Sequence, residues 1–187
     1  MNKVIYELHS DTRKYSLFIQ DYDPSKEESI MGLAMRNRWV PFSNYSAVRL
    51  ELSKSDTGKK NYQFDISGSL GPSFVFSEAA IECLSDILKP RGQILPVLTE
   101  SKKKSYWGYY PTNSLGNCFD RNNSKYRTAE RGLIIEKPAL VSLNIIDDYL
   151  FCIDEDISRV FVTDTFKNRV EEAGLLGFDF SVEVFTS

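Results

Sequence analysis

Histidine is the scarcest of the residues that build catalytic and metal sites in this sequence. The 187 residues include one histidine, His9. A zinc site with two or three histidine ligands is therefore impossible within one chain. A serine or cysteine nucleophile with a histidine base would have to use His9. Since His9 follows a predicted strand over residues 4–8, we interpret it as a strand-end surface residue.

Cysteine and long apolar runs are scarce as well. The sequence has three cysteines, which lie far apart: Cys83, Cys118 and Cys152. This odd number and wide spacing exclude a disulfide framework and a CxxC metal site. We therefore predict free thiols in a reducing cytoplasm. Charged residues from Glu7 onward interrupt any signal-peptide core. No uncharged apolar run approaches the roughly 20 residues that span a bilayer. We therefore expect a cytoplasmic protein with no membrane association.

The charge is nearly balanced overall but unevenly distributed along the chain, whose formal net charge is −3. Residues 101–131 carry seven basic and two acidic side chains, a net charge of +5. Residues 132–187 carry four basic and eleven acidic side chains, a net charge of −7. Either these two segments face each other in the fold, or one of them forms a binding surface.

Two segments predict the same strand-to-helix unit. Residues 74–78 and 160–164 are each a β-type run that ends in a hydroxyl residue and an acid. The hydroxyl can cap a following helix, and the acid lies at the positive end of the helix dipole. Apolar residues at helical spacing follow both runs. Pro90 ends the first predicted helix, and Gly174 with Leu175 ends the second in the pattern of a Schellman cap.

The remaining pattern is mostly that of strands, in keeping with an aromatic share of 13%. Phe178, Phe180, Val182 and Val184 alternate with polar residues, which predicts a C-terminal strand with all four on one face. Further strands are predicted over 15–21, 47–52, 94–98, 133–136 and 149–153, and a short helix over 29–39. The predicted class is α+β: a mixed, largely antiparallel β-sheet packed by two main helices, with the strand–helix unit used twice.

An acidic cluster is the first candidate for chemistry. Asp154 and Asp156 flank Glu155 and share one side of an extended chain, and Asp147 and Asp148 lie nearby in the sequence. Because converging carboxylates bind Mg²⁺ or Ca²⁺, one interpretation is a small metal-dependent enzyme. The other is a solvated acidic turn. We favour the turn because no nucleotide motif accompanies the cluster, and we assign no metal and no cofactor.

The basic segment is the second candidate. Lys102, Lys103 and Lys104 precede Trp107 and the pair Tyr109-Tyr110. Basic groups neutralise phosphates and exposed aromatics stack on bases, so a nucleic-acid-binding module is conceivable. The alternative is a strand that packs its aromatics between solvated lysines. The acidic C-terminal segment and the sequence pI near 5.3 argue against direct nucleic-acid binding.

The order of motifs from residue 74 to residue 180 resembles a family of bacterial immunity proteins from polymorphic toxin systems, immunity family eleven, formerly a domain of unknown function. The matching series is Phe74-Val75-Phe76-Ser77-Glu78, Gly92-Gln93-Ile94-Leu95-Pro96-Val97, Tyr109-Tyr110, Asn113-Ser114-Leu115-Gly116-Asn117-Cys118-Phe119-Asp120, Arg159-Val160-Phe161-Val162-Thr163-Asp164, Ala173-Gly174-Leu175 and Gly177-Phe178-Asp179-Phe180. The resemblance divides the chain into a variable, partner-facing β-rich part over 1–70 and an immunity-family-like α+β domain over 71–187, within one compact unit.

The resemblance implies an inhibitor without catalytic residues, which binds a cognate secreted toxin domain, such as a nuclease, and occludes its active site or a nearby surface. Two surfaces compete for this role. The acidic one comprises Asp147, Asp148, Asp154, Glu155 and Asp156, which would mimic phosphates in a basic toxin cleft. The other is the loop around Trp107, Tyr109 and Tyr110, which would suit an acidic or neutral toxin. The oligomeric state stays open.

Overall fold

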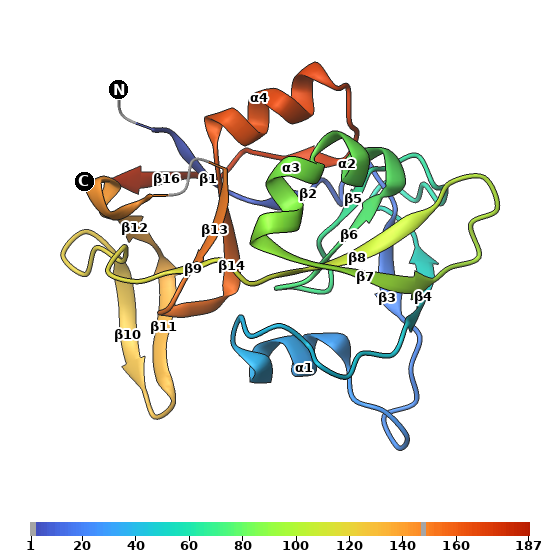
Figure 1. Cartoon of the computed structure of the whole chain (residues 1–187), viewed down its shortest axis with the longest axis horizontal. Helices are drawn as coiled ribbons and strands as arrows, with labels where there is room; N and C mark the ends of the chain where they lie inside the picture. The colour runs from blue at the N-terminus through green and yellow to red at the C-terminus, as the bar shows by residue number, and fades with distance from the viewer. Residues whose placement is uncertain (1–2, 147–148) are drawn as a thin grey trace.

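A computed structural model describes residues 3–146 and 149–187, and its strands form two large sheets (Figure 1). The first sheet has six strands. In spatial order they are β12 (Ala139–Leu140), β16 (Glu183–Thr186), β1 (Ile5–Glu7), β14 (Asp156–Thr163), β13 (Leu150–Ile153) and β9 (Ser114–Leu115). The pairs β1–β14, β1–β16 and β13–β14 are antiparallel, whereas β12–β16 and β13–β9 are parallel.

The second sheet also has six strands and curls so that its two edges approach each other. In spatial order they are β3 (Leu17–Gln20), β4 (Val48–Ser53), β7 (Gly92–Leu98), β8 (Tyr106–Pro111), β6 (Phe74–Ser77) and β5 (Ile66–Ser67). The backbone N–H of Phe18 on β3 donates to Ser67 Oγ on β5 at 3.0 Å, and Ser69 Oγ donates to the Phe18 carbonyl. Side-chain hydrogen bonds thus bridge the two edges of a barrel-like sheet.

Short helices and two small ladders complete the chain. The helical elements are α1 (Ile30–Asn37), α2 (Glu78–Cys83), α3 (Ser85–Leu88), η1 (Lys89–Arg91), η2 (Ser142–Asn144) and α4 (Asp164–Glu172). The ladders pair β10 (Lys125–Ala129) with β11 (Gly132–Lys137), and β2 (His9–Ser10) with β15 (Phe178–Asp179). No described helix is long and apolar enough to cross a membrane.

The first sheet is buried on both faces, because β13 and β14 alternate their apolar side chains between two cores. Leu150 and Val162 join Phe76 of β6, Tyr109 of β8 and apolar residues of α2, α3 and α4 in a central core between the sheets. The opposite face forms an outer core, which includes Ile5, Phe119, Phe151, Phe161 and Val184. A third core, of Phe18, Leu50, Phe64, Val75 and Tyr106 among others, fills the curled second sheet.

The α+β class and the repeated strand–helix unit are confirmed. Strand β6 leads into α2, and β14 leads into α4; both helices pack on the central core. Ser77 caps α2 by accepting a hydrogen bond from the Ala80 N–H at 3.1 Å. At the end of α4, Gly174 has φ +65°, and Leu175 N–H donates to the Val170 carbonyl at 3.2 Å, which completes the predicted Schellman cap. The helix predicted over 29–39 is α1.

Two helix predictions need correction. The helix after Ser77 is broken at Leu84, whose φ of −107° and ψ of 14° separate α2 from α3. Thr163 occupies the N-cap position of α4 without making a side-chain capping hydrogen bond. The two main helices of the prediction are therefore α2–α3 and α4, with α1 as an additional helix on the second sheet.

The C-terminal strand is the clearest error, because its four apolar residues do not share one face. Val184 lies five residues after Asp179, whereas their partners Ile5 and His9 are four apart, so the C-terminal strand holds one extra residue between them. Such a bulge reverses the side-chain alternation. Phe178 and Phe180 consequently contact the central core, Val184 lies in the outer core, and Val182 is exposed.

Residues 1–70 contribute strands to both large sheets. Their strand β1 lies inside the first sheet between β16 and β14, and their strands β3, β4 and β5 complete the second sheet. Residues from both sides of the boundary predicted at residues 70 and 71 contribute to the same sheets and to the same cores.

Candidate partner-binding cleft

The acidic turn between β13 and β14 lines a cleft of about 410 Å³. Its other walls come from the end of α1 and from the turn of the β10–β11 hairpin, which lie on the same side of the molecule in Figure 1. The side chains that matter for its chemistry are Met35, Arg38, Arg121, Arg131, Asp154 and Glu155. Segments distant in the sequence thus meet in one depression.

Asp154 and Asp156 have different environments within this turn. Asp154 is exposed and accepts a hydrogen bond from Ser114 Oγ. Asp156 is buried, with 8% of its surface exposed, and pairs with Arg159 while accepting hydrogen bonds from Ser158 N and Oγ at 2.9 and 2.6 Å. The structure therefore assigns Asp156 to the internal packing of the turn, in correction of its predicted role as an exposed toxin-binding acid.

Arg159 extends this internal network toward β1. Its Nε lies 3.1 Å from Glu7 Oε1, and Glu7 Oε2 lies 3.0 Å from His9 Nε2. The Arg159 side chain is 23% exposed and that of Glu7 11%. His9, the only histidine of the chain, is an exposed residue of β2 and has Glu7 as its carboxylate partner.

Three arginines face the acidic turn without an ion-pair partner among the described residues: Arg38, Arg121 and Arg131. Arg121 stacks near Phe119 and Tyr126, with its guanidinium carbon 5.8 Å from each ring centroid. The basic segment 101–131 and the acidic segment 132–187 thus meet here. The turn is part of a mixed-charge cleft and not of a uniformly acidic surface.

Glu155 carries an unusual unsatisfied group. Its Oε2 is buried and has no hydrogen-bond partner in the described part of the chain. A buried carboxylate oxygen without a donor lowers stability, and a donor from outside the chain would relieve this cost. Close by, burial and then the charges of Glu155 and Asp154 raise the pKa of the Cys118 thiol to about 11. That thiol therefore stays protonated at neutral pH and is a poor nucleophile.

The aromatic alternative must be corrected. Tyr109 and Tyr110 are fully buried in β8, where their hydroxyls donate to the Leu88 and Ala34 carbonyls at 2.9 and 3.1 Å. Neither can contact a partner or stack on a base. Trp107 is half-buried and lines a different cavity, of about 460 Å³.

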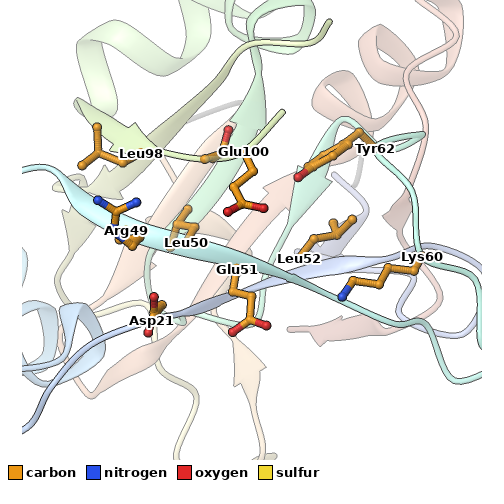
Figure 2. A pocket seen from close by; sticks show the side chains of 10 residues that line it. Asp21, Arg49, Leu50, Glu51, Leu52, Lys60, Tyr62, Leu98 and Glu100 are labelled. Carbon is orange, nitrogen blue, oxygen red and sulfur yellow. The ribbon is translucent and has the colours of Figure 1, made fainter. Parts of the chain in front are cut away.

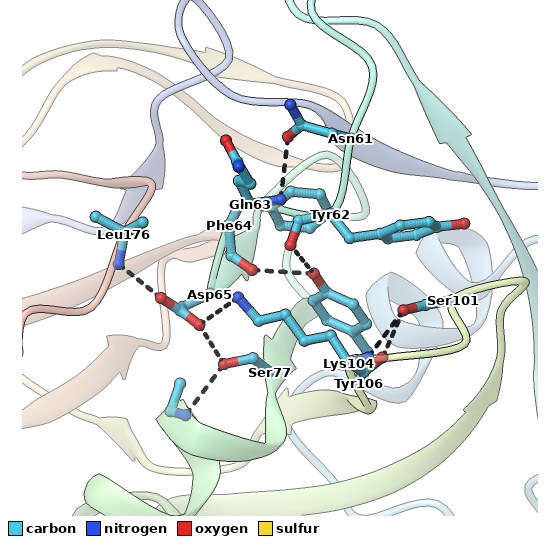
Figure 3. A network of polar contacts seen from close by, with 11 residues as sticks. Asn61, Tyr62, Gln63, Phe64, Asp65, Ser77, Ser101, Lys104, Tyr106 and Leu176 are labelled. Carbon is cyan, nitrogen blue, oxygen red and sulfur yellow. Dashed lines mark hydrogen bonds and ion pairs between the residues drawn. The ribbon is translucent and has the colours of Figure 1, made fainter.

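The lysines near Trp107 are only partly solvated. Lys102 and Lys103 are exposed, but Lys104 Nζ lies 2.8 Å from the carboxylate of buried Asp65. Figure 3 shows this carboxylate at the centre of a network that also includes Ser77 and the Leu176 N–H. Lys104 therefore has a structural partner, which leaves two of the three lysines on the surface.

Asp147 and Asp148, two acids of the predicted toxin-binding surface, lie outside the described residues. Among those described, no group of three or more histidine, cysteine, aspartate or glutamate side chains is placed to hold a metal ion. The three cysteines are free thiols, of which Cys83 is only partly buried.

The arginine side of the cleft was not predicted. The net charge of +5 over residues 101–131 was a signal for Arg121 and Arg131, although the lysines and aromatics of that segment were weighed instead. Met35 lies in α1 and Arg38 is the C-cap residue of that helix, and nothing in the local pattern relates the helix to a turn more than a hundred residues later. A comparison with protein-family models and with curated proteins finds no match for this chain.

Proposed function

We propose that this chain is an immunity protein, which acts in the cytoplasm of the producing cell by binding a cognate secreted toxin domain and occluding its active site or an adjacent surface. The motif series that resembles immunity family eleven supports this proposal. Its residues occupy scaffold positions such as the Ser77 cap, the Gly174 cap and the cores. An inhibitor of this kind needs a stable scaffold and a binding surface rather than a catalytic constellation.

The mixed-charge cleft is the observation that supports our choice of the toxin-binding surface. Arginine and methionine are enriched at protein interfaces, and desolvated arginines are frequent centres of binding energy. The cleft presents three arginines without ion-pair partners in the described chain, next to Met35, which is 40% exposed. A partner with carboxylates opposite the arginines and a hydrogen-bond donor opposite Glu155 would pair both kinds of charged group.

This cleft changes the expected electrostatics of the toxin contact. Simple phosphate mimicry would require a surface of one sign, whereas here Asp154 and Glu155 face three arginines. We therefore expect the toxin surface to carry charges of both signs. The resulting association should weaken with added salt, but less steeply than that of a purely acidic inhibitor with a basic nuclease.

Co-expression tests the proposal. The C-terminal domain encoded by the adjacent gene is expressed alone and with this protein, and growth and co-purification are scored. We expect toxicity from the domain alone, and rescue together with a stable complex when both are present. Rescue without a complex would contradict binding as the mechanism and favour an enzyme that reverses the damage. Toxicity unaffected by this protein, for every plausible neighbouring gene, would refute the immunity function.

Point variants then test the cleft. Arg131→Ala and Met35→Ala should each weaken the complex about tenfold or more, which corresponds to about 1.4 kcal/mol. Their free energies of unfolding should change by less than about 0.5 kcal/mol. The matched control is Arg127→Ala, because Arg127 is exposed on the same hairpin and does not line the cleft. Equal affinities for all three variants and the unmodified protein would exclude this surface.

A further inference from the structure

A second opening lies on the other sheet, beside strand β4, and is independent of the proposed toxin contact. Strand β4 pairs with β3 over Leu50–Ser53, but with β7 only at Val48 and Arg49. Beyond Arg49, within the described residues, one side of β4 has no neighbouring strand. A cavity of about 400 Å³ lies along this side.

The backbone of β4 directs hydrogen-bonding groups into this cavity. Phe18, the partner of Leu52 on β3, directs its N–H to Ser67 Oγ and its carbonyl to Ser69 Oγ, which is away from β4. In an antiparallel pair, opposite residues either exchange both backbone hydrogen bonds or exchange none. Phe18 and Leu52 therefore form a pair without hydrogen bonds, and the N–H and C=O of Leu52 point away from β3, toward the opening.

The far wall of the opening consists of Tyr62, Leu98 and Glu100 (Figure 2). Leu98 is 47% exposed. Burial, and next the negative charge of Glu100, raise the pKa of the Tyr62 hydroxyl, and both side chains line the opening. Strand β7 ends at Leu98, so the opening begins where the pairing between β4 and β7 stops.

Charged side chains surround the opening, and carboxylates outnumber cations. Asp21, Glu51 and Glu100 face Arg49 and Lys60. All five are exposed, and none forms an ion pair with another described residue. The excess negative charge and the open strand edge complement a chain that is extended and basic.

We propose that this opening is a docking site for an extended polypeptide segment of another protein, which carries lysine or arginine, adds to β4 as a strand and places a cation beside Glu100. The backbone of the segment bonds to Leu52, and alternate side chains of the segment lie against Leu98 and solvent. The competing explanation is that the charges merely protect an exposed edge from pairing.

Peptide binding to the full chain distinguishes these explanations. The probe is an amidated peptide, Thr-Lys-Val-Lys-Val-Lys-Thr, which carries a fluorescent dye on its N-terminus and is titrated by fluorescence anisotropy. The first control peptide carries glutamate in place of lysine, and the second carries N-methyl groups on alternate backbone nitrogens. We expect the lysine peptide to bind about tenfold or more tightly than the glutamate peptide, and the methylated peptide not to bind. The Leu52 amide should become protected from hydrogen exchange only with the lysine peptide.

Protein variants locate the contact. Glu100→Gln should weaken binding of the lysine peptide several-fold, while Glu172→Gln, an exposed acid on the distant helix α4, should leave it unchanged. No binding at millimolar peptide, an unprotected Leu52 amide, or equal affinity for the lysine and glutamate peptides would overturn the proposal. Self-association of the chain that Glu100→Gln abolishes would overturn it too, because the occupant would then be a second copy. None of these results depends on a toxin.

Discussion

Replacing Asp65 with asparagine should lower the stability of the protein, because it removes a buried carboxylate that has three partners. The Asp65 side chain is 9% exposed and accepts three short contacts: from Lys104 Nζ at 2.8 Å, Ser77 Oγ at 2.6 Å and Leu176 N at 2.7 Å. These partners come from the β7–β8 loop, the α2 cap and the segment after α4, as Figure 3 shows. The carboxylate therefore joins three segments that are far apart in the sequence.

The size of the effect follows from these contacts. Hydrogen bonds to a charged group contribute about 1.5–3 kcal/mol each, and removing one partner of a buried ion pair costs about 3–5 kcal/mol. Asparagine keeps one acceptor oxygen but turns its NH₂ group toward a donor. Lys104 is 29% exposed and can partly turn to water, so we expect a loss of about 3 kcal/mol at neutral pH. For a chain of this size the melting temperature should fall by about 6–12 °C.

The dependence on pH identifies the cause. Burial raises the pKa of Asp65, but hydrogen bonds from Lys104, Ser77 and Leu176 and the charge of Lys104 outweigh it, so the pKa is lowered overall. A lowered pKa contributes stability above the unfolded value of about 3.9, which is lost as the pH falls through the folded value. The difference between the unmodified protein and Asp65→Asn should therefore be largest near pH 7 and narrow below about pH 4.

Urea unfolding at a series of pH values measures this difference, with Asp56→Asn as the matched control on an exposed loop. The control should change the free energy of unfolding by less than about 0.5 kcal/mol. A loss below about 1 kcal/mol for Asp65→Asn, or a loss that stays constant from pH 7 to pH 3, would refute the reasoning.

Further predictions concern other positions of the scaffold. Arg159→Met leaves the two buried carboxylates that it bridges without their cation, and should lower the free energy of unfolding by about 3 kcal/mol in a denaturant titration; a loss below about 1 kcal/mol would contradict this role. Gly92→Ala places a methyl group 2.6 Å from the Tyr109 ring and should lower the free energy of unfolding by about 2 kcal/mol. Gly116→Ala, whose nearest atom is a side-chain oxygen 3.2 Å away, should cost less. The reverse order of the two losses would contradict the packing. Gly174→Ala meets no atom within 4 Å but has φ +65°, so thermal unfolding should show a purely conformational loss of about 1 kcal/mol.

The local elements could be predicted from the sequence because their causes lie within a few residues. Ser77 caps a helix since its hydroxyl reaches a backbone N–H three residues later, and Gly174 ends one because it tolerates a positive φ. The strand predicted over residues 149–153 is likewise present, as β13. Each of these features depends on interactions between residues that are close in the sequence.

Which strands pair with one another, and which core each side chain enters, depends on the tertiary structure. Period two predicted one strand from Phe178 to Val184, but one extra residue between the β15–β2 and the β16–β1 pairings moved Val184 to a different core. The sequence around Tyr109-Tyr110 did not distinguish an exposed loop from a buried strand. The pair is buried because both faces of β8 are covered.

The candidate cleft depended on long-range pairing most of all. The basic segment 101–131 and the acidic segment 132–187 could either contact each other or form separate binding surfaces. Their composition is compatible with both arrangements and does not distinguish them. The contact arises because the β10–β11 hairpin and α1 are brought beside the β13–β14 turn. Composition and local pattern therefore determined the class and the caps of this protein, whereas the cleft followed from strand pairing between residues distant in the chain, which no local pattern encodes.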